Sequence, residues 1–253
     1  TVSEVSGQDV TVDYASSDVS TTAGSDYTSS TGTVTILAGN TTQTFNVPVL
    51  VDTLDEVNET STLTLSNPTN ATISDATGTL TIVDDDATPS LSINDVSYTE
   101  SGTGGNATFT VTLSEVSAQE VTVNYASSNN TATAGSDYTA ASGTVTIAAG
   151  ATSATFNVPV SADTLDEASE TATMTLSSPT NATISDATGT LTIVDDDTAP
   201  TLSINDVSYT ESGTGGNATF TVTLSEVSAQ NVTVDYASSD VSTTAGSDYT
   251  SST

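Results

Sequence analysis

Carboxylates gather in two kinds of segment in this sequence, and both segments recur. Three adjacent aspartates, Asp195, Asp196 and Asp197, end the run Ile-Val-Asp-Asp-Asp, and the acidic pattern Asp-Thr-Leu-Asp-Glu-Ala-Ser-Glu begins at Asp163. Two unit charges about 4 Å apart repel by about 4 kcal/mol at a near-surface effective dielectric of about 20. The chain has no Lys, Arg or His, so the counter-charge must come from solvent as a cation. Hard oxygen ligands in this number predict Ca²⁺ as the cofactor.

These segments belong to an internal repeat. The stretch from Asp163 to Asp197 has an earlier copy from Asp52 to Asp86, 111 residues before it. The first 31 residues match 223–253 almost residue for residue, at twice that offset. The repeat predicts an incomplete module that lacks its first strands at 1–86, a complete module at 90–197, and the first strands of a third module at 201–253.

The overlap between the two end pieces has two explanations. Either the chain is a window of a long continuous array, or separate chains complete each other by strand addition. We favour the continuous array, because strand addition usually needs a specialised donor strand. The short linkers at 87–90 and 198–201 each carry a proline, and we expect them to connect successive modules stiffly.

The hydrophobic pattern within the complete module has a period of two residues. Phe109, Val111 and Leu113 alternate with threonines, and similar short runs recur up to Ile193 without a helical period. Such runs, separated by turn signals, predict half-buried strands. The expected fold class is all-β, with tandem immunoglobulin-like β-sandwich modules at a period of about 111 residues.

Glycine and proline give finer expectations for this sandwich. Gly-Thr-Gly-Gly at 102–105 predicts a hairpin turn, and Ser178-Pro179 predicts a turn between strands. Pro159 lies within a strand pattern, which favours an edge strand or a bulge because proline cannot donate to the ladder.

Composition restricts the partners. A formal charge of −32 without any basic residue excludes electrostatic binding to nucleic acid or to an anionic membrane. No stretch is apolar enough to predict direct membrane insertion. The chain has no cysteine, so bound metal is the expected substitute for disulfides. Expected partners are neighbouring modules of the same or identical chains, and glycans are a second class that this composition permits.

Enzyme activity is not expected. Paired carboxylates could serve glycoside hydrolysis, but the same acids recur in each module, and an enzyme seldom repeats its active site along a rod. The chain also has no His, Cys or Lys for other catalysis. Sites for N-glycans follow the pattern Asn-X-Thr at Asn40, Asn58, Asn70, Asn106, Asn129, Asn181, Asn217 and Asn231.

Five segments of the complete module carry a family resemblance. They are Thr-Ala-Thr-Ala-Gly-Ser-Asp-Tyr at 131–138, Ser-Gly-Thr-Val-Thr-Ile at 142–147, Asp-Thr-Leu-Asp-Glu-Ala-Ser-Glu-Thr at 163–171, Leu-Ser-Ser-Pro-Thr-Asn-Ala at 176–182, and Gly-Thr-Leu-Thr-Ile-Val-Asp-Asp-Asp at 189–197. The sequence resembles the Calx-beta family, whose sandwiches occur in sodium–calcium exchangers, in an integrin subunit and in large bacterial surface proteins. Members with a complete acidic set bind Ca²⁺ at one end of the sandwich.

The resemblance implies a set of metal ligands in each module. In the complete module these are Glu100, Asp137, Asp163, Glu167, Glu170, Asp195, Asp196 and Asp197. In the first module they are Asp26, Asp52, Glu56, Glu59, Asp84, Asp85 and Asp86, and Glu211 and Asp248 begin the third set. For Asp137 an alternative stays open, because an aspartate in such a turn also caps its own loop.

One departure from the family lowers the expected number of ions. Tightly binding members often carry two adjacent acids where this chain has Val51-Asp52 and Ala162-Asp163. Because the number of ligand charges tunes calcium affinity, we expect one or two Ca²⁺ per module and a structural role.

The resulting functional hypothesis is an extracellular or cell-surface structural protein, a calcium-stabilised array that forms a filament or the stalk of an adhesin. The first alternative is a carbohydrate- or partner-binding adhesin module, which needs an exposed aromatic platform. The second is a calcium-sensing regulatory domain, which needs the full acidic set. The few tyrosines and the missing acid at Ala162 disfavour these alternatives.

Overall fold

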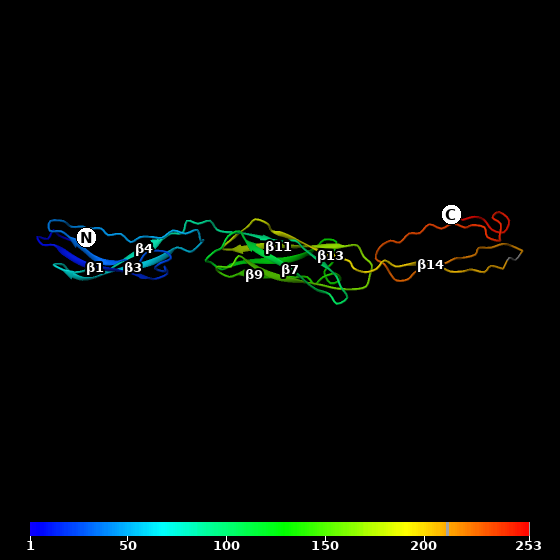
Figure 1. Ribbon diagram of the computed structural model, residues 1–253, viewed down its shortest axis with the longest axis horizontal. Helices are drawn as coiled ribbons and strands as arrows, with labels where there is room; N and C mark the ends of the chain where they lie inside the picture. Colours follow the sequence, from blue (N-terminus) through cyan, green and yellow to red (C-terminus); the bar gives the residue numbers. More distant parts are fainter. Residues whose placement is uncertain (211–212, 253) are drawn as a thin grey trace.

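The chain is drawn out into three units placed end to end (Figure 1). A computed structural model describes residues 1–210 and 213–252. All regular elements in these ranges are strands, and no helix there has the length and apolarity that a membrane crossing requires. We call the units module 1 (1–86), module 2 (90–197) and module 3 (201–253).

Module 2 is a sandwich of two sheets. One sheet has the order β10-β7-β5-β12, with the strands β5 (Ser90–Ile93), β7 (Gly105–Leu113), β10 (Ser153–Val160) and β12 (Thr183–Ile184). The other has the order β6-β13-β11-β8-β9, with β6 (Val96–Thr99), β8 (Val121–Asn129), β9 (Ser142–Ile147), β11 (Glu170–Thr180) and β13 (Thr188–Val194). The expected all-β sandwich is confirmed.

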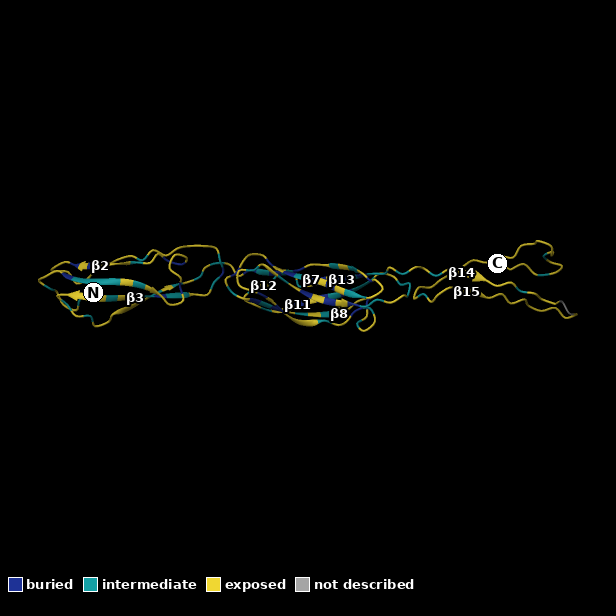
Figure 2. Ribbon diagram, turned by 60° about the horizontal axis from the view of Figure 1, so that its bottom comes forward, coloured by how far each residue is buried: buried dark blue, intermediate teal, exposed yellow. Residues whose placement is uncertain are grey.

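The period-two pattern places the apolar side chains of both sheets between them. Phe109, Val111 and Leu191 are fully buried, while the threonines between these positions are exposed or partly exposed. The strands of module 2 accordingly include buried, dark blue stretches (Figure 2). Phe156 lies between two other rings, stacked on Phe109 at 5.4 Å and on Tyr125 at 3.8 Å between centroids. Burial of these side chains at roughly 25 cal/mol per Å² is the main force that holds the two sheets together.

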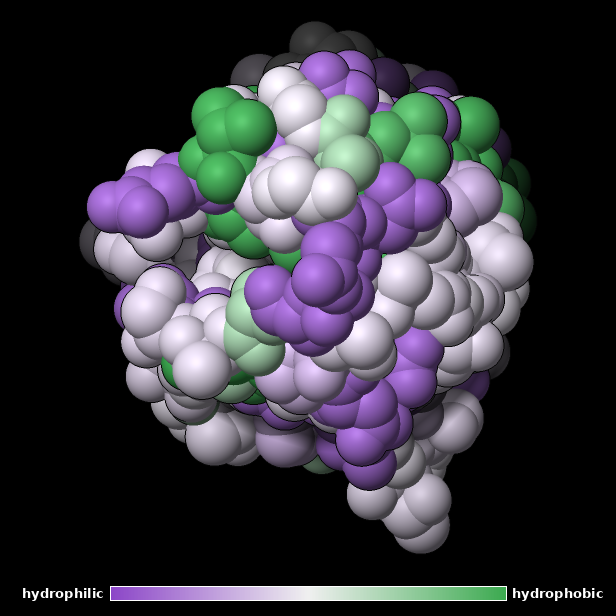
Figure 3. Space-filling view, turned by 90° about the vertical axis from the view of Figure 1, so that its left-hand side faces the viewer, coloured by the Kyte–Doolittle hydropathy of each residue, from purple (hydrophilic) through white to green (hydrophobic). Residues whose placement is uncertain are grey.

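Module 1 consists of one sheet with the order β2-β1-β3-β4. Its strands are β1 (Val10–Asp18), β2 (Thr31–Ile36), β3 (Glu59–Thr69) and β4 (Thr77–Ile82). They correspond in sequence and pairing to β8, β9, β11 and β13 of module 2. Without the second sheet, side chains such as Phe45 and Val49 are exposed, and apolar patches appear among polar ones in the end view (Figure 3).

Module 3 has two paired strands in the part that the structure describes, β14 (Leu202–Ile204) and β15 (Val222–Leu224). They pair antiparallel with Ser203 opposite Thr223. The corresponding residues of module 2 lie in β5 and β7, which pair in the same way.

Two turn predictions are wrong, and one edge prediction is confirmed. Residues 102–105 do form a turn, but it joins β6 of one sheet to β7 of the other, so it is not a hairpin. Ser178-Pro179 lies inside β11, where the register with β8 shifts and Ser178 has a φ of 50°. The two residues therefore form a bulge, because the ladder resumes at Thr180. Pro159 lies in β10, which is an edge strand.

Candidate metal centre

Asp137 is held by a rigid turn between β8 and β9. Gly135 adopts a φ of +100°, which glycine tolerates without strain, and its N–H donates to the Tyr138 carbonyl at 2.8 Å. The Asp137 Oδ2 accepts the Thr133 N–H at 2.6 Å. The buried Tyr138 anchors the turn by donating its hydroxyl to Asn129 Oδ1 at 2.7 Å. Asp137 thus caps its own loop, which was the alternative to metal binding in the sequence analysis.

The same aspartate also lies beside two glutamates. Glu167 comes from the acidic loop and Glu170 from the first position of β11. One carboxylate oxygen of each of Asp137, Glu167 and Glu170 lies within 4.8 Å of the others. Two oxygens that flank a Ca²⁺ ion at the usual 2.3–2.6 Å are separated by up to about 5 Å. The three oxygens therefore have a spacing that fits one calcium ion.

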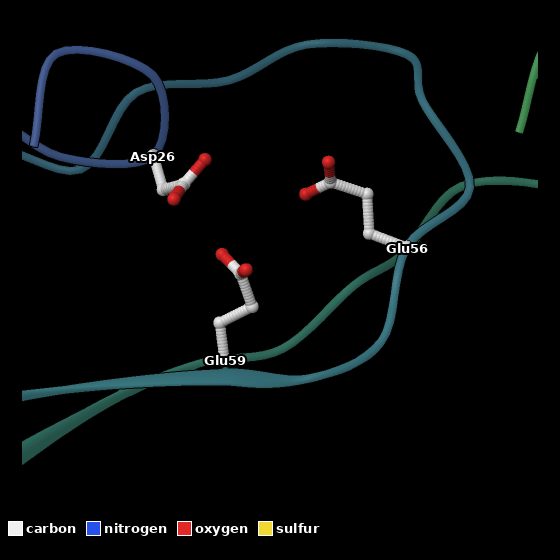
Figure 4. A group of neighbouring side chains, drawn as sticks. All are labelled: Asp26, Glu56 and Glu59. Carbon is white, nitrogen blue, oxygen red and sulfur yellow. The ribbon is translucent and has the colours of Figure 1, made fainter. Parts of the chain in front are cut away.

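Module 1 repeats this arrangement with its own residues. Asp26, Glu56 and Glu59 form the equivalent group within 4.8 Å, and their carboxylates point toward one another (Figure 4). They line a pocket of about 130 Å³, together with the other predicted ligands of this module, Asp52, Asp84, Asp85 and Asp86. The structure thus gathers the whole predicted set of module 1 around one cavity.

The aspartates after β13 extend the cluster in module 2. Asp195 Oδ1 accepts the Glu167 N–H at 3.3 Å and so ties the end of the strand to the acidic loop. Asp197 Oδ2 is shielded from solvent but accepts no hydrogen bond from any described residue. A shielded carboxylate oxygen without a partner is costly unless a cation contacts it. Asp196 is exposed.

Glu100 enters the cluster from a different strand. It directly follows β6, its N–H donates to the Val194 carbonyl at 3.0 Å, and its side chain is only 6% exposed. Burial, followed by the charges of nearby carboxylates, raises the pKa of Glu100 to about 7; these carboxylates are Asp163, Asp195, Glu167 and Asp197. A glutamate with this pKa is only partly ionised at neutral pH unless positive charge is brought near it.

The other glutamates of the cluster also have raised pKa values, in both modules. The pKa values of Glu59 and Glu170 are each raised to about 7, mainly by burial. A hydrogen bond to an aspartate and the charge of that aspartate, Asp26 for Glu59 and Asp137 for Glu170, act in the same direction. Burial and nearby carboxylates also raise the pKa values of Glu56 and Glu167. No basic residue exists in the sequence to relieve this repulsion.

Asp52 and Asp163 lie outside the groups of three carboxylates, although Asp52 lines the cavity of module 1. Each is exposed, and its Oδ1 accepts a backbone N–H two residues ahead at 2.8 Å, from Leu54 and Leu165 respectively. Neither belongs to a group of three carboxylates. Asp163 still acts on the cluster through its charge, which is the largest cause of the raised Glu100 pKa after burial.

The third set is represented by Asp248 alone. Its Oδ2 accepts the Thr244 N–H at 2.8 Å, which is the capping contact of Asp137. Within 1–210 and 213–252 it joins no group of three carboxylates. Glu211, the other predicted ligand of this set, lies outside the described residues.

Two acidic residues have a role that was not predicted from the sequence. Asp55 and Asp166 occupy the fourth position of the acidic pattern, and neither is in a carboxylate group. Each instead contacts the following module through a serine, Ser117 or Ser228. The regular recurrence of Ser-X-Gln at 111-residue spacing was the available signal.

The donor set of modules 1 and 2 therefore fits a hard divalent cation. It consists of carboxylate oxygens at calcium-like spacing, a shielded oxygen without a partner, and glutamates whose ionisation is suppressed. Such a set matches Ca²⁺ better than softer metals, which prefer nitrogen or sulfur.

Comparison with known families identifies this arrangement. A family profile described as the Calx-beta domain matches residues 1–86, 84–197 and 195–253. The chain belongs to the Calx-beta domain family. The three matches follow one another along nearly the whole sequence, so the tandem repeat is a repeat of Calx-beta modules.

Solved structures similar to this chain include Calx domains. The crystal structure of CBD12 from CALX1.2 has 18% identity and a TM-score of 0.37, covering 76% of this chain and 90% of that one. The apo-form Calx CBD1 domain has 19% identity and a TM-score of 0.38, covering 44% of this chain and 100% of that one. The calcium binding domain CBD12 of CALX1.1 has 20% identity and a TM-score of 0.32, covering 68% of each chain. No curated protein matches the sequence.

Proposed function

We propose that this chain is a structural Calx-beta array that works outside the cell, in a filament or a surface stalk, and is stabilised by Ca²⁺ at the acidic cluster of each module. The observation that carries the proposal is the pair of equivalent groups, Asp26, Glu56 and Glu59 in module 1 and Asp137, Glu167 and Glu170 in module 2. A repeated site along an extended chain suits a structural role (Figure 1).

Named residues would hold the ion in each module. In module 2 the three grouped carboxylates would be joined by Glu100, Asp195 and Asp197, and in module 1 by Asp84 and Asp86. A bound cation would supply the positive charge that the sequence lacks. The turn of Asp137, the acidic loop and the end of β13 come from separate parts of the chain. An ion bound by carboxylates from all three segments would link these segments to one another.

The extracellular setting is supported by two features. Extracellular Ca²⁺ is plentiful enough to fill weak, structural sites, which bind in the range of about 10⁻⁴–10⁻³ M in extracellular modules. The absence of Lys and Arg also leaves no cleavage site for trypsin-like proteases. A calcium sensor would need tighter binding, and Val51 and Ala162 reduce the negative charge available for it.

The test is calorimetric titration of the full chain with Ca²⁺, in parallel with thermal unfolding in millimolar Ca²⁺ and in excess chelator. We expect binding at modules 1 and 2 and a higher melting temperature with Ca²⁺. Glu170→Gln should remove binding at module 2, while Glu120→Gln, an exposed carboxylate outside the cluster, should change neither. Absence of any heat of binding or thermal shift with Ca²⁺ would refute the proposal, and submicromolar affinity would favour a sensor.

A further inference from the structure

The junction between modules 1 and 2 contains a buried carboxylate that the metal centre does not use. Asp55 is 6% exposed and forms a parallel bridge with Ser117, which is 1% exposed. The Ser117 hydroxyl donates to Asp55 Oδ2 at 2.8 Å, and the Gln119 side-chain amide donates to the same atom at 3.3 Å. The Ala118 N–H donates to the Asp55 carbonyl at 3.0 Å. Three donors of module 2 therefore satisfy one residue of module 1.

The junction between modules 2 and 3 has the same contacts. Asp166 forms a parallel bridge with Ser228, whose hydroxyl donates to Asp166 Oδ2 at 2.6 Å. The Ala229 N–H donates to the Asp166 carbonyl at 3.0 Å. The Gln230 amide here donates to the Glu167 carbonyl at 3.1 Å. The aspartate–serine contact is thus a property of the repeat and occurs with two independent sets of residues.

The serine turn keeps its shape whether or not an acidic loop contacts it. Ser117 Oγ accepts the Gln119 N–H at 3.0 Å, and its carbonyl accepts the Gly150 N–H at 2.9 Å. In module 1 the equivalent Ser6 makes the same two hydrogen bonds, with Gln8 at 3.0 Å and with Gly39 at 2.9 Å. No described aspartate hydrogen-bonds to Ser6. The turn is therefore preformed, which lowers the entropy lost when an acidic loop docks.

We propose that Asp55 and Asp166 are recognition residues for the next module, forming with its Ser-X-Gln turn a clasp that fixes each junction without a metal ion. Adjacent residues of one loop have different roles, since Glu56 joins the carboxylate group while Asp55 contacts Ser117. In a chain without basic residues, hydroxyl and amide donors are the protein groups that can bind a carboxylate across a junction. The partner of each acidic loop is a Ser-X-Gln turn of another Calx-beta module.

The clasp is tested by measuring the distance between modules in excess chelator. Because the sequence has no cysteine, Thr35→Cys and Thr146→Cys, at exposed equivalent positions in β2 and β9, permit specific spin labelling of the full chain. Asp55→Asn and Ser117→Ala should each broaden the distance distribution. The double variant should broaden it no further than the larger single effect, because both changes remove one contact. Amide exchange at Ala118, whose N–H donates to the Asp55 backbone carbonyl, should accelerate roughly tenfold or more, because the junction opens more often once the serine hydrogen bond to the charged carboxylate is lost.

The matched control is Glu120→Gln, which neutralises an exposed carboxylate near the turn and should leave the distribution unchanged. Asp55 and Ser117 lie in different modules, so local unfolding in one variant does not affect the result obtained with the other variant. Circular dichroism detects such unfolding. An unchanged distance distribution in both single variants would overturn the clasp. If Asp55 were a metal ligand, its substitution would lower calcium affinity and have no effect in chelator. Work in chelator also separates this test from the proposed function, which is refuted by the absence of a heat of binding or of a thermal shift with Ca²⁺.

Discussion

Module 1 and module 2 differ in the number of sheets but share the arrangement of three grouped carboxylates. In module 2 two sheets enclose a core, whereas module 1 has the single sheet β2-β1-β3-β4. Both place one aspartate and two glutamates with an oxygen of each within 4.8 Å, and the second glutamate in each has a pKa raised to about 7. The comparison shows that one sheet and its loops suffice to assemble the grouped carboxylates, whereas Glu100 requires β6.

The largest expected effect on stability concerns equivalent phenylalanines that are packed differently in the two modules. Phe156 is 8% exposed and is stacked between two rings, while its counterpart Phe45 is 36% exposed and stacks on Tyr14 alone. Phe156→Ala should destabilise module 2 by about 3–5 kcal/mol, the usual cost of a buried phenylalanine. Phe45→Ala should cost module 1 about 1 kcal/mol, since it loses mainly one aromatic pair. Chemical unfolding of the full chain, followed by residue-specific amide exchange, measures both; equal losses would contradict the difference in packing.

The second prediction concerns pH, and it treats the modules alike. In the folded protein the pKa values of Glu59 and Glu170 are raised to about 7, above the ordinary glutamate value of 4.5. The folded state therefore binds more protons than the unfolded state between these two values, and stability falls as pH rises from about 4.5 through 7. In chelator the melting temperature should drop between pH 5 and pH 7.5.

Saturating Ca²⁺ should flatten this pH profile, because a bound cation favours the ionised glutamates and so lowers their pKa values in the folded protein. At about 100 times the dissociation constant it should also stabilise the folded state by about 2.7 kcal/mol. Glu170→Gln should remove that residue's contribution and so reduce the pH slope of module 2, where Glu100 still contributes, and should leave the slope of module 1 unchanged. A melting temperature in chelator that rises over this pH range would show that the pKa values of the glutamates are not raised in the folded protein.

The third prediction tests Glu100, a ligand candidate of module 2 that has no counterpart among residues 1–86. Glu100 comes from the sheet position that β6 occupies beside β13. Glu100→Gln should weaken calcium binding at module 2 roughly tenfold, about 1.4 kcal/mol, because the site loses one charged ligand. Module 1 serves as the internal reference, and its affinity in the same titration should not change. If binding at module 2 is unaltered, Glu100 is a buried acid outside the ion site.

The smallest expected effect compares two glycines with the same backbone. Gly135 and Gly24 have φ values of 100° and 99°, and a Cβ at either position would meet no atom within 4 Å. Gly135→Ala and Gly24→Ala should therefore each cost about 1 kcal/mol, through backbone strain alone. Thermal unfolding with and without Ca²⁺ measures the loss. Unequal losses would mean that the two turns, and so the positions of Asp137 and Asp26, are not equivalent.

Much of this architecture could be predicted from residue order. Alternation of apolar residues with threonine determines which faces of the strands are buried, because side chains of a strand point to alternate sides. The Gly-Ser-Asp-Tyr turn follows from the need for a positive φ at Gly135 and from the capping capacity of Asp137. A charge of −32 without basic residues determined that any counter-charge must come from solvent.

The tertiary structure decided how the acidic residues divide their roles. Asp55 and Glu56 are adjacent in sequence, yet one contacts the next module and the other joins the carboxylate group. Asp196 is exposed while Asp197 has a shielded oxygen. Ser178-Pro179 reads as a turn, but it is a bulge because β8 pairs on both sides of it. These outcomes depend on which segments meet in space, since burial and partners, rather than residue type, determine what a carboxylate does.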